Sequence, residues 1–180
     1  MSIQADITAN RSKRNWRHRA LMGRCLWWLV TPLFRLSPRQ FWVWRVWLLR
    51  CFGAQVGAGV HVHPSVRIMI PWHLSIGDQA AIGDAAILYA LGPITIGPRA
   101  TVSQYAHLCA GSHDWRDPAR PLIKGPIQIG ADAWVCADAF VGPGVRIGRG
   151  AILGARAVAM KDLAAGHIGT GNPMQSRVAA

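Results

Sequence analysis

The sequence predicts an all-β fold, a parallel β-helix of about five triangular coils that follows an N-terminal helical segment. One observation is an aliphatic residue at every sixth position. The other is a small residue four positions after each of these. The longest unbroken run pairs Ile129, Val135, Val141, Ile147 and Leu153 with Ala133, Ala139, Val145, Ala151 and Ala157. The same two columns extend over residues 56–159.

Each six-residue unit reads as a short strand followed by a corner. Alternation directs Ala133 and Val135 to one side of a strand and Trp134 to the other. Glycines such as Gly130 follow aliphatic positions, where they let the chain turn. Six residues are too few for a βαβ crossover, so successive strands must stack as the sides of a coil. A meander of antiparallel hairpins is disfavoured, because hairpin loops would break a phase that holds over five consecutive units.

Interruptions of the repeat all fall in one register. Coils of three strands begin at Val56, Ile76, Ile96, Ile129 and Ile147, which are 20, 20, 33 and 18 residues apart. In each coil longer than eighteen residues, the extra residues follow the third strand, so the extensions are expected to stack at one corner. The longest, residues 109–126, holds His113, Asp114, Trp115, Arg116, Asp117, Arg120 and Lys124. The expected organisation is an arm (1–53), a β-helix (54–163) with an active-site loop (109–126), and a C-terminal tail (164–180).

The positive charge of the chain is concentrated in the arm. Residues 1–53 hold ten Arg and Lys against one acid, Asp6, and six of the nine tryptophans, within a net charge of +12 for all 180 residues. Arginine together with tryptophan favours anionic, amphipathic surfaces. Nucleic acid is not an expected partner, because no recognition motif accompanies the charge and the β-helix repeats are nearly neutral.

Two short helices are expected in the arm. The first is expected to end at about Trp28–Arg35. The second covers Pro38–Cys51, with Ser37 as its N-cap and a proline in its first turn. The uncharged run over residues 25–34 is too short to span a bilayer. The helices either cover the open end of the β-helix or lie on an anionic membrane leaflet through residues 11–53, and both roles stay open. Without a secretory signal pattern, the expected location is the cytoplasm, with or without peripheral contact to the inner face of the cell membrane.

Few residue types are available for acid–base chemistry. The chain has no glutamate, so a general base must come from seven histidines or eight aspartates. His113 is the leading candidate because it lies in the long extension, although a histidine in a loop is more often merely solvated. The four cysteines show no CxxC spacing. They predict reduced residues that form neither a disulfide nor a metal site.

Several segments resemble a known family. The loop LCAGSHDWRDP (108–118), the run over residues 126–162 and the ending GTGNP (169–173) are similar to the left-handed β-helix hexapeptide acyltransferases. Within that family, residues 37–57 and 71–78 look most like colanic-acid-type exopolysaccharide O-acetyltransferases. The resemblance covers about residues 21–178. It implies that the coil is left-handed, which the spacing cannot show.

The resemblance also implies a reaction. An acetyl-CoA-dependent O-acetyltransferase would acetylate a sugar hydroxyl in exopolysaccharide or glycoconjugate biosynthesis, with His113 as general base and no metal. Asp114 or a backbone carbonyl would fix the tautomer of the imidazole, and the N–H of Gly111 or Ser112 would bind the oxyanion. The expected substrate contacts are Ser112, Trp115 and Trp134. For Trp134, ordinary surface packing is an equal alternative.

Other residues are carried over for the cofactor and the partners. In family members, certain segments lie beside the nucleotide end of CoA, and the matching residues of this chain are Gly154, Lys161, Asn172 and Pro173. The chain has Gln175 where relatives carry Lys or Arg, so Arg177 or Arg156 would take the phosphate contact. Family members are homotrimers with active sites between subunits. The saccharide acceptor could be lipid-linked and contact Arg39, Arg45 and Arg50, although a solvated helix face explains these arginines equally well.

Two other functions on the same fold are considered. A zinc enzyme of the γ-carbonic-anhydrase type needs three converging histidines. His107 and His113 are six residues apart, and no third histidine is suitably placed. A non-catalytic hexapeptide scaffold is the second alternative, and it would tolerate the loss of His113.

Overall fold

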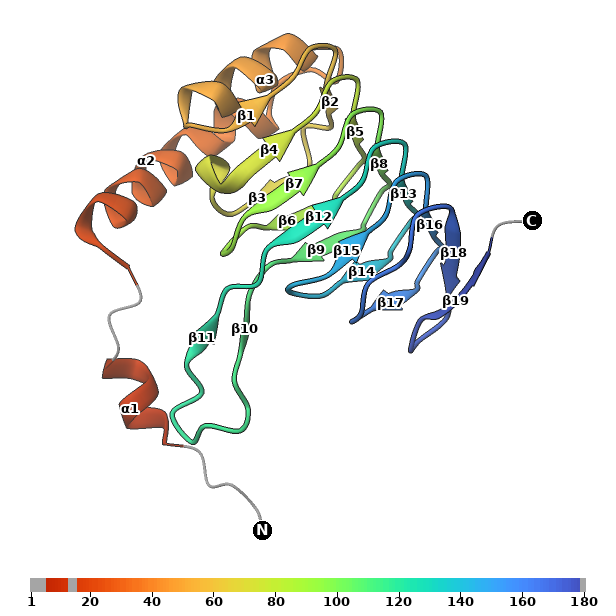
Figure 1. Cartoon of the computed structure of the whole chain (residues 1–180). Helices are drawn as coiled ribbons and strands as arrows, with labels where there is room; N and C mark the ends of the chain where they lie inside the picture. Colours follow the sequence, from red (N-terminus) through yellow and green to blue (C-terminus); the bar gives the residue numbers. More distant parts are fainter. Residues whose placement is uncertain (1–5, 13–15, 179–180) are drawn as a thin grey trace.

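The β-helix forms a triangular prism with helices packed at its N-terminal end (Figure 1). This computed structural model describes residues 6–12 and 16–178. Parts of the predicted arm (1–5 and 13–15) and of the tail (179–180) lie outside the described residues, so the expected membrane contact over residues 11–53 is described only in part.

Three parallel sheets form the sides of the prism, and short strands of the same coil lie on different sides. Sheet A contains β1 (Gln55–Val56), β4 (Leu74–Ile76), β7 (Ile94–Ile96), β12 (Ile127–Ile129) and β15 (Arg146–Ile147). Sheet B contains β2 (His61–Val62), β5 (Ala81–Ile82), β8 (Thr101–Val102), β13 (Trp134–Val135), β16 (Ile152–Leu153), β18 (His167–Thr170) and β19 (Gln175–Val178). Sheet C contains β3 (Arg67–Ile68), β6 (Ile87–Tyr89), β9 (His107–Cys109), β14 (Phe140–Val141) and β17 (Val158–Ala159).

The register confirms the two columns of the repeat. In sheet A the predicted first residues of the coils lie beside one another, as Val56, Ile76, Ile96, Ile129 and Ile147. Their side chains are buried, as are the alanines of the second column, such as Ala133 and Ala139. Because strand side chains alternate, this arrangement fills the interior with aliphatic residues and leaves the outward positions to other residue types.

Close stacking of the coils, more than backbone conformation, explains the glycine after an aliphatic position. A Cβ on Gly130 would lie 2.5 Å from the backbone nitrogen of Arg149 in the next coil. Positive φ angles occur instead at corner residues such as Asp132 (φ 61°) and Asp138 (φ 59°). Asp and Asn tolerate this left-handed conformation better than most residues.

All three extensions of the repeat lie at the corner between sheets C and A, as predicted. The first contains the 3-10 helix η1 (Pro71–His73), and the second is a bend after β6. The third, between β9 and β12, projects as an antiparallel hairpin of β10 (Ser112–His113) and β11 (Leu122–Ile123). Figure 1 shows this hairpin reaching away from the prism.

Three helices precede the coils: α1 (Ile7–Ser12), α2 (His18–Arg35) and α3 (Trp42–Cys51). Helices α2 and α3 cover the open end of the β-helix. Trp27 and Phe34 of α2 and Leu49 of α3 are buried in the core, and the indole Nε1–H of Trp27 donates to Ile68 O at 2.8 Å. The edge strand β3 is therefore capped, in agreement with the first of the two expected roles. No helix among the described residues is long and apolar enough to span a membrane.

The second helix of the arm begins four residues later than predicted. Ser37 does not cap it, because its hydroxyl donates to Phe34 O at 2.7 Å. Instead, residues 37–40 wrap around the buried guanidinium of Arg45, which donates to Ser37 Oγ, Pro38 O and Arg39 O at 2.6–2.8 Å. Its Nε–H also donates to Val62 O at 2.6 Å. Pro38 O also accepts from the N–H of Phe41 at 3.0 Å, so this segment forms a turn around the charge and not the first turn of the helix.

The coil continues beyond residue 163 into part of a sixth turn. Leu163 forms a bridge with Ile147, and β18 pairs in parallel with β16. Strand β19 then returns antiparallel to β18, with Arg177 opposite Ile168. This hairpin closes the C-terminal edge of sheet B, so no further parallel strand follows among the described residues.

Candidate active site

The β10–β11 hairpin fixes the side chain of His113. The imidazole Nδ1 lies 2.6 Å from the backbone oxygen of Arg120, and a carbonyl can only accept, so Nδ1–H is the donor. In the neutral ring Nε2 then carries the free lone pair. His113 is exposed, opposite Leu122 in the hairpin. The geometry leaves Nε2 available as a proton acceptor.

Asp114 does not hold the imidazole through this bond. Its Oδ1 accepts from the N–H of Arg116 at 3.0 Å, and its own N–H donates to Pro121 O at 3.0 Å. The carboxylate therefore closes a local Asx turn at the tip of the hairpin. Of the two groups considered for fixing the tautomer, the backbone carbonyl is the one in contact.

Helix α1 packs on the tip of the same hairpin. The Nδ2 group of Asn10 donates to Ala119 O at 2.8 Å and to Arg120 O at 2.9 Å. The N–H of Asp6 donates to Pro118 O at 2.8 Å, and the ammonium of Lys124 lies 4.1 Å from the Trp16 ring centroid. Sequence reasoning missed this contact, because an isolated Asn in a basic arm carries no signal of a partner more than 100 residues away.

The remaining loop residues predicted for substrate contact are on the surface. Ser112 and Trp115 are exposed, and the guanidinium of Arg116 lies 5.1 Å from the Trp115 ring centroid. Among the residues that the structure describes, no three His, Cys, Asp or Glu side chains are grouped as metal ligands. The described part of the loop therefore offers imidazole, indole and guanidinium groups.

A polar hollow on sheet B is the second feature of the site. Trp134 projects outward, 48% exposed, and its Nε1–H donates to Ser103 Oγ at 2.8 Å. Beside Ser103, a hollow of about 600 Å³ is lined by Arg39, Trp42, His61, His63, Asp84 and Gln104, among others. The rings of Trp42 and His61 stack with centroids 4.7 Å apart. No pattern in the sequence connects these residues, which come from α3, its preceding loop and three coils.

The residues predicted to accompany CoA gather at the C-terminal end. Along sheet B, Trp134 is followed by Ile152, Ile168 and Arg177, so three strand spacings of about 4.8 Å separate the indole from Arg177. Gly154 N–H donates to Gly169 O at 2.7 Å. The turn with Asn172 and Pro173 rests on β17, where Met174 N–H donates to Val158 O at 3.1 Å. Lys161 is exposed at the corner between sheets C and A.

The predicted base and two of the residues predicted for the substrates, Trp134 and Arg177, lie on opposite sides of one chain, whereas Lys161 lies at the same corner as His113. His113 projects from the corner between sheets C and A, whereas Trp134 and Arg177 belong to sheet B. In a triangular prism, sheet B is the side that faces away from that corner. A site that uses both sets of residues therefore requires two copies of the chain.

Arginine side chains of the first helices are not equivalent. Arg45 is fully buried, and burial lowers the pKa of its guanidinium. Arg50 donates to Val56 O at 2.6 Å and to Gly57 O at 3.0 Å. The expected acceptor contact by Arg45 is therefore wrong, because backbone carbonyls surround its charge. Of the three arginines, only Arg39 lines the hollow on sheet B.

Known proteins resemble this chain in sequence and in fold. A family model described as bacterial transferase hexapeptide (six repeats) matches residues 126–158. Over 149 residues, the chain is 46% identical to the protein assigned as colanic acid biosynthesis acetyltransferase WcaF in Escherichia coli (strain K12), with 82% of each chain covered. The chain belongs to the hexapeptide-repeat transferase family. It is accordingly an acyltransferase.

Solved structures of hexapeptide-repeat acetyltransferases share the fold of this family member. A maltose O-acetyltransferase from Clostridium difficile 630 superposes with a TM-score of 0.83 at 19% identity, over 99% of this chain and 100% of the other. An acetyltransferase from Vibrio cholerae O1 biovar eltor, complexed with acetyl coenzyme A, gives a TM-score of 0.84 at 21% identity, over 91% and 90%. The fold is the left-handed parallel β-helix that the resemblance implied.

Proposed function

We propose that this hexapeptide-repeat transferase is an O-acetyltransferase that moves an acetyl group from acetyl-CoA to a sugar hydroxyl in exopolysaccharide or glycoconjugate biosynthesis. The observation that carries this proposal is the 2.6 Å bond from His113 Nδ1 to Arg120 O, which leaves Nε2 as an oriented base. The relative at 46% identity is assigned to colanic acid biosynthesis, which supports a saccharide acceptor.

The reaction proceeds by direct transfer. Nε2 of His113 takes the proton of the sugar hydroxyl while its oxygen attacks the thioester carbonyl carbon. The tetrahedral intermediate collapses with breakage of the C–S bond, and the imidazolium returns the proton to the CoA sulfur. The backbone N–H of Gly111 or Ser112, next to the base in the sequence, would stabilise the oxyanion. No covalent enzyme intermediate is needed.

Donor and acceptor would bind on sheet B. The polar hollow lined by Arg39, Trp42 and His61 offers stacked rings and hydrogen-bonding groups, which suit a saccharide. Trp134 lies between this hollow and Arg177, which is proposed for CoA together with Gly154, Lys161, Asn172 and Pro173; of these, Lys161 lies at the corner between sheets C and A, and the turn with Asn172 and Pro173 rests on β17. The cationic groups of Lys161 and Arg177 suit the CoA phosphates.

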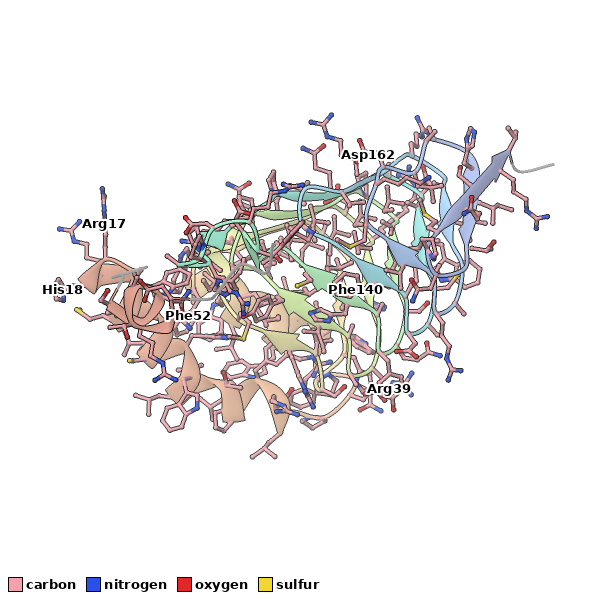
Figure 2. All side chains as sticks on the ribbon, turned by 90° about the horizontal axis from the view of Figure 1, so that it is seen from below. Arg17, His18, Arg39, Phe52, Phe140 and Asp162 are labelled. Carbon is pink, nitrogen blue, oxygen red and sulfur yellow. The ribbon has the colours of Figure 1, made fainter. Side chains whose placement is uncertain are left out.

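A homotrimer would complete the site, since His113 and Trp134 of one chain face apart. Sheet C is suited to packing against other copies because its outer face carries Ile87, Tyr89, His107, Phe140 and Val158. Figure 2 shows Phe140 on this side of the prism. The rings of His107 and Phe140 meet edge to face with centroids 5.2 Å apart. Such an aromatic side is typical of subunit interfaces.

Thiol release from acetyl-CoA with candidate saccharides tests the proposal. His113→Ala should lower the turnover at least about a hundredfold, as expected for loss of a general base. His18→Ala, at an exposed position on α2, is the matched control and should retain full turnover. Equal rates for His113→Ala and wild type would refute the base. No thiol release with any acceptor would favour the scaffold alternative, and stoichiometric zinc in purified protein would favour the hydratase.

We also infer that α2 and α3 contact the surface of a membrane. Their outer side exposes large apolar side chains, among them Trp28 (74% exposed), Leu36 and Val43 (both 84%). Arginines of the same helices favour anionic lipids. Deleting the arm would also uncover the β-helix, so the test is flotation of Trp28→Ser/Leu36→Ser with anionic vesicles. Flotation equal to that of wild type would contradict this contact.

A further inference from the structure

A cavity of about 500 Å³ lies between α2 and the edge strand β3, away from the proposed active site. Its apolar wall includes Leu21, Trp27, Phe34, Val66 and Ile68. The size is in the range of small-molecule sites. The reaction proposed above has no use for it.

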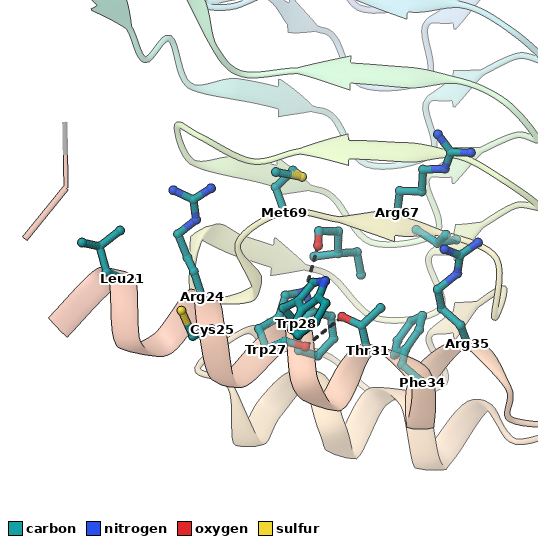
Figure 3. A pocket seen from close by; sticks show the side chains of 12 residues that line it. Leu21, Arg24, Cys25, Trp27, Trp28, Thr31, Phe34, Arg35, Arg67 and Met69 are labelled. Atoms are coloured by element: carbon teal, nitrogen blue, oxygen red, sulfur yellow. Dashed lines mark hydrogen bonds between the residues drawn. The ribbon is translucent and has the colours of Figure 1, made fainter. Parts of the chain in front are cut away.

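Two uncharged polar groups of the cavity wall, the Trp27 indole and the Thr31 hydroxyl, are already hydrogen-bonded. Trp27 Nε1–H donates to Ile68 O at 2.8 Å, and the Thr31 hydroxyl donates to Trp27 O at 2.8 Å. Both bonds are drawn in Figure 3. Because these donors are already satisfied, they offer no hydrogen bond to a polar ligand. A hydrocarbon chain, in contrast, would be stabilised in this cavity by its transfer out of water.

Three arginines surround this apolar wall. Figure 3 shows Arg24 and Arg35 extending from α2 on either side of Trp28, with Arg67 and Met69 on the neighbouring strand. The lining contains no acidic residue, and no ion pair among the described residues includes any of the three arginines. The combination of an apolar interior and a cationic rim complements an amphiphile with a phosphate group.

The apolar surface continues from the cavity along α2. A hollow of about 550 Å³ shares Trp28, Thr31 and Arg35 with the cavity. A further hollow of about 550 Å³ shares Pro32 and Leu36 with that one and extends to Trp44. Contiguous exposed apolar surface, here with Trp28, Leu29, Leu33 and Leu36 each more than half exposed, is typical of interaction sites. Its continuity favours an occupant that comes from a bilayer.

We propose that this cavity binds an anionic phospholipid of the membrane, with an acyl chain against Trp27 and Phe34 and the phosphate among Arg24, Arg35 and Arg67. The site would hold the enzyme at the leaflet by a specific lipid in addition to general adsorption. This inference rests on the membrane contact proposed above. It is independent of the assignment of His113.

Short-chain lipids that stay monomeric test the site by calorimetric titration of the full-length protein. The probes are dihexanoyl phosphatidylglycerol, dihexanoyl phosphatidylcholine, farnesyl phosphate and inorganic phosphate. The variant Arg24→Gln/Arg67→Gln removes two rim charges, and Arg17→Gln/Arg19→Gln removes two exposed charges outside the cavity. Cys25→Trp places a bulky ring at the cavity wall as a second test.

Dihexanoyl phosphatidylglycerol should bind at least about tenfold tighter than dihexanoyl phosphatidylcholine. Arg24→Gln/Arg67→Gln should weaken it about tenfold and Cys25→Trp should also weaken it, whereas Arg17→Gln/Arg19→Gln should not. Equal binding of the two lipids, or no effect of the rim variant, would overturn the proposal. If farnesyl phosphate bound more tightly, the site would belong to an isoprenoid carrier and not to a phospholipid. If inorganic phosphate alone competed with the lipid, the site would recognise only the anion.

Vesicle flotation separates this inference from the membrane contact on which it rests. Wild type should float with vesicles of phosphatidylcholine and phosphatidylglycerol more than with phosphatidylcholine alone, and the rim variant should lose that difference. Equal flotation with both vesicles would refute the lipid site and leave general adsorption. Absence of flotation with either would refute the membrane contact itself.

Discussion

Asn10 and His113 donate hydrogen bonds to the same backbone oxygen. The Nδ2 group of Asn10 lies 2.9 Å, and Nδ1 of His113 lies 2.6 Å, from Arg120 O. Arg120 itself has a positive φ of 43°, so the carbonyl sits in a turn that the side chain of Asn10 helps to hold. A residue of the N-terminal arm thus fixes the group that orients the proposed base.

Replacing Asn10 should impair turnover without weakening substrate binding. Asn10→Ala and Asn10→Asp both remove the donor of the bonds to Ala119 O and Arg120 O, and loss of the bond that holds Arg120 O, about 1 kcal/mol, should lower kcat about fivefold with KM unchanged. The measurement is steady-state thiol release. Ser12→Ala is the matched control, because among the described residues its hydroxyl bonds within α1, to Ala9 O. A rise in KM with an unchanged kcat would contradict a positioning role.

Substitution of Asp114 separates a turn-forming carboxylate from a catalytic one. Asn at this position keeps an oxygen that can accept from the N–H of Arg116. Asp114→Asn should therefore retain kcat/KM within about twofold, whereas Asp114→Ala should lose the turn and part of the activity. If Asp114→Asn were as inactive as His113→Ala, the negative charge itself would be required.

The buried Arg45 should be essential for stability. Arg45→Met leaves Val62 O and Arg39 O without this donor, whereas Pro38 O keeps its bond from the N–H of Phe41, and a buried unsatisfied acceptor such as Val62 O costs about 1–3 kcal/mol. We expect the free energy of unfolding to fall by about 2–4 kcal/mol in urea titrations, after relaxation of the loop. Arg39→Met, at an exposed position, should change it by less than about 0.5 kcal/mol. A small effect of Arg45→Met would mean that water satisfies these carbonyls.

His107 should make stability depend on pH. Burial lowers the pKa of its imidazole, and its buried Nε2 has no hydrogen-bond partner among the described residues. Below about pH 6.5 the unfolded chain binds a proton at this residue that the folded chain does not, so the free energy of unfolding falls as the pH falls. His107→Phe should flatten this slope in denaturation series from pH 7.5 to 5, whereas His18→Phe should not. An unchanged slope would assign the dependence to other groups.

The repeat was readable from sequence because it is local. Val56, Ile76 and Ile96 fall in one column whatever the rest of the chain does, since strand alternation fixes which side chains go inside. The position of the loop followed from the same count. The start of α3 did not, because Ser37 and Pro38 carry a local signal for a helix start that the buried guanidinium of Arg45 overrides.

The coil, its register and the corner at which His113 projects follow from the six-residue period, because that period leaves one way to stack short parallel strands. The surroundings of the imidazole depend on contacts that form on folding. The bonds from Asn10 and from His113 to Arg120 O join residues far apart in the chain, and no periodicity encodes such contacts. The same holds for the hollow on sheet B and the arginine-rimmed cavity under α2, whose linings are assembled from segments that meet only after folding.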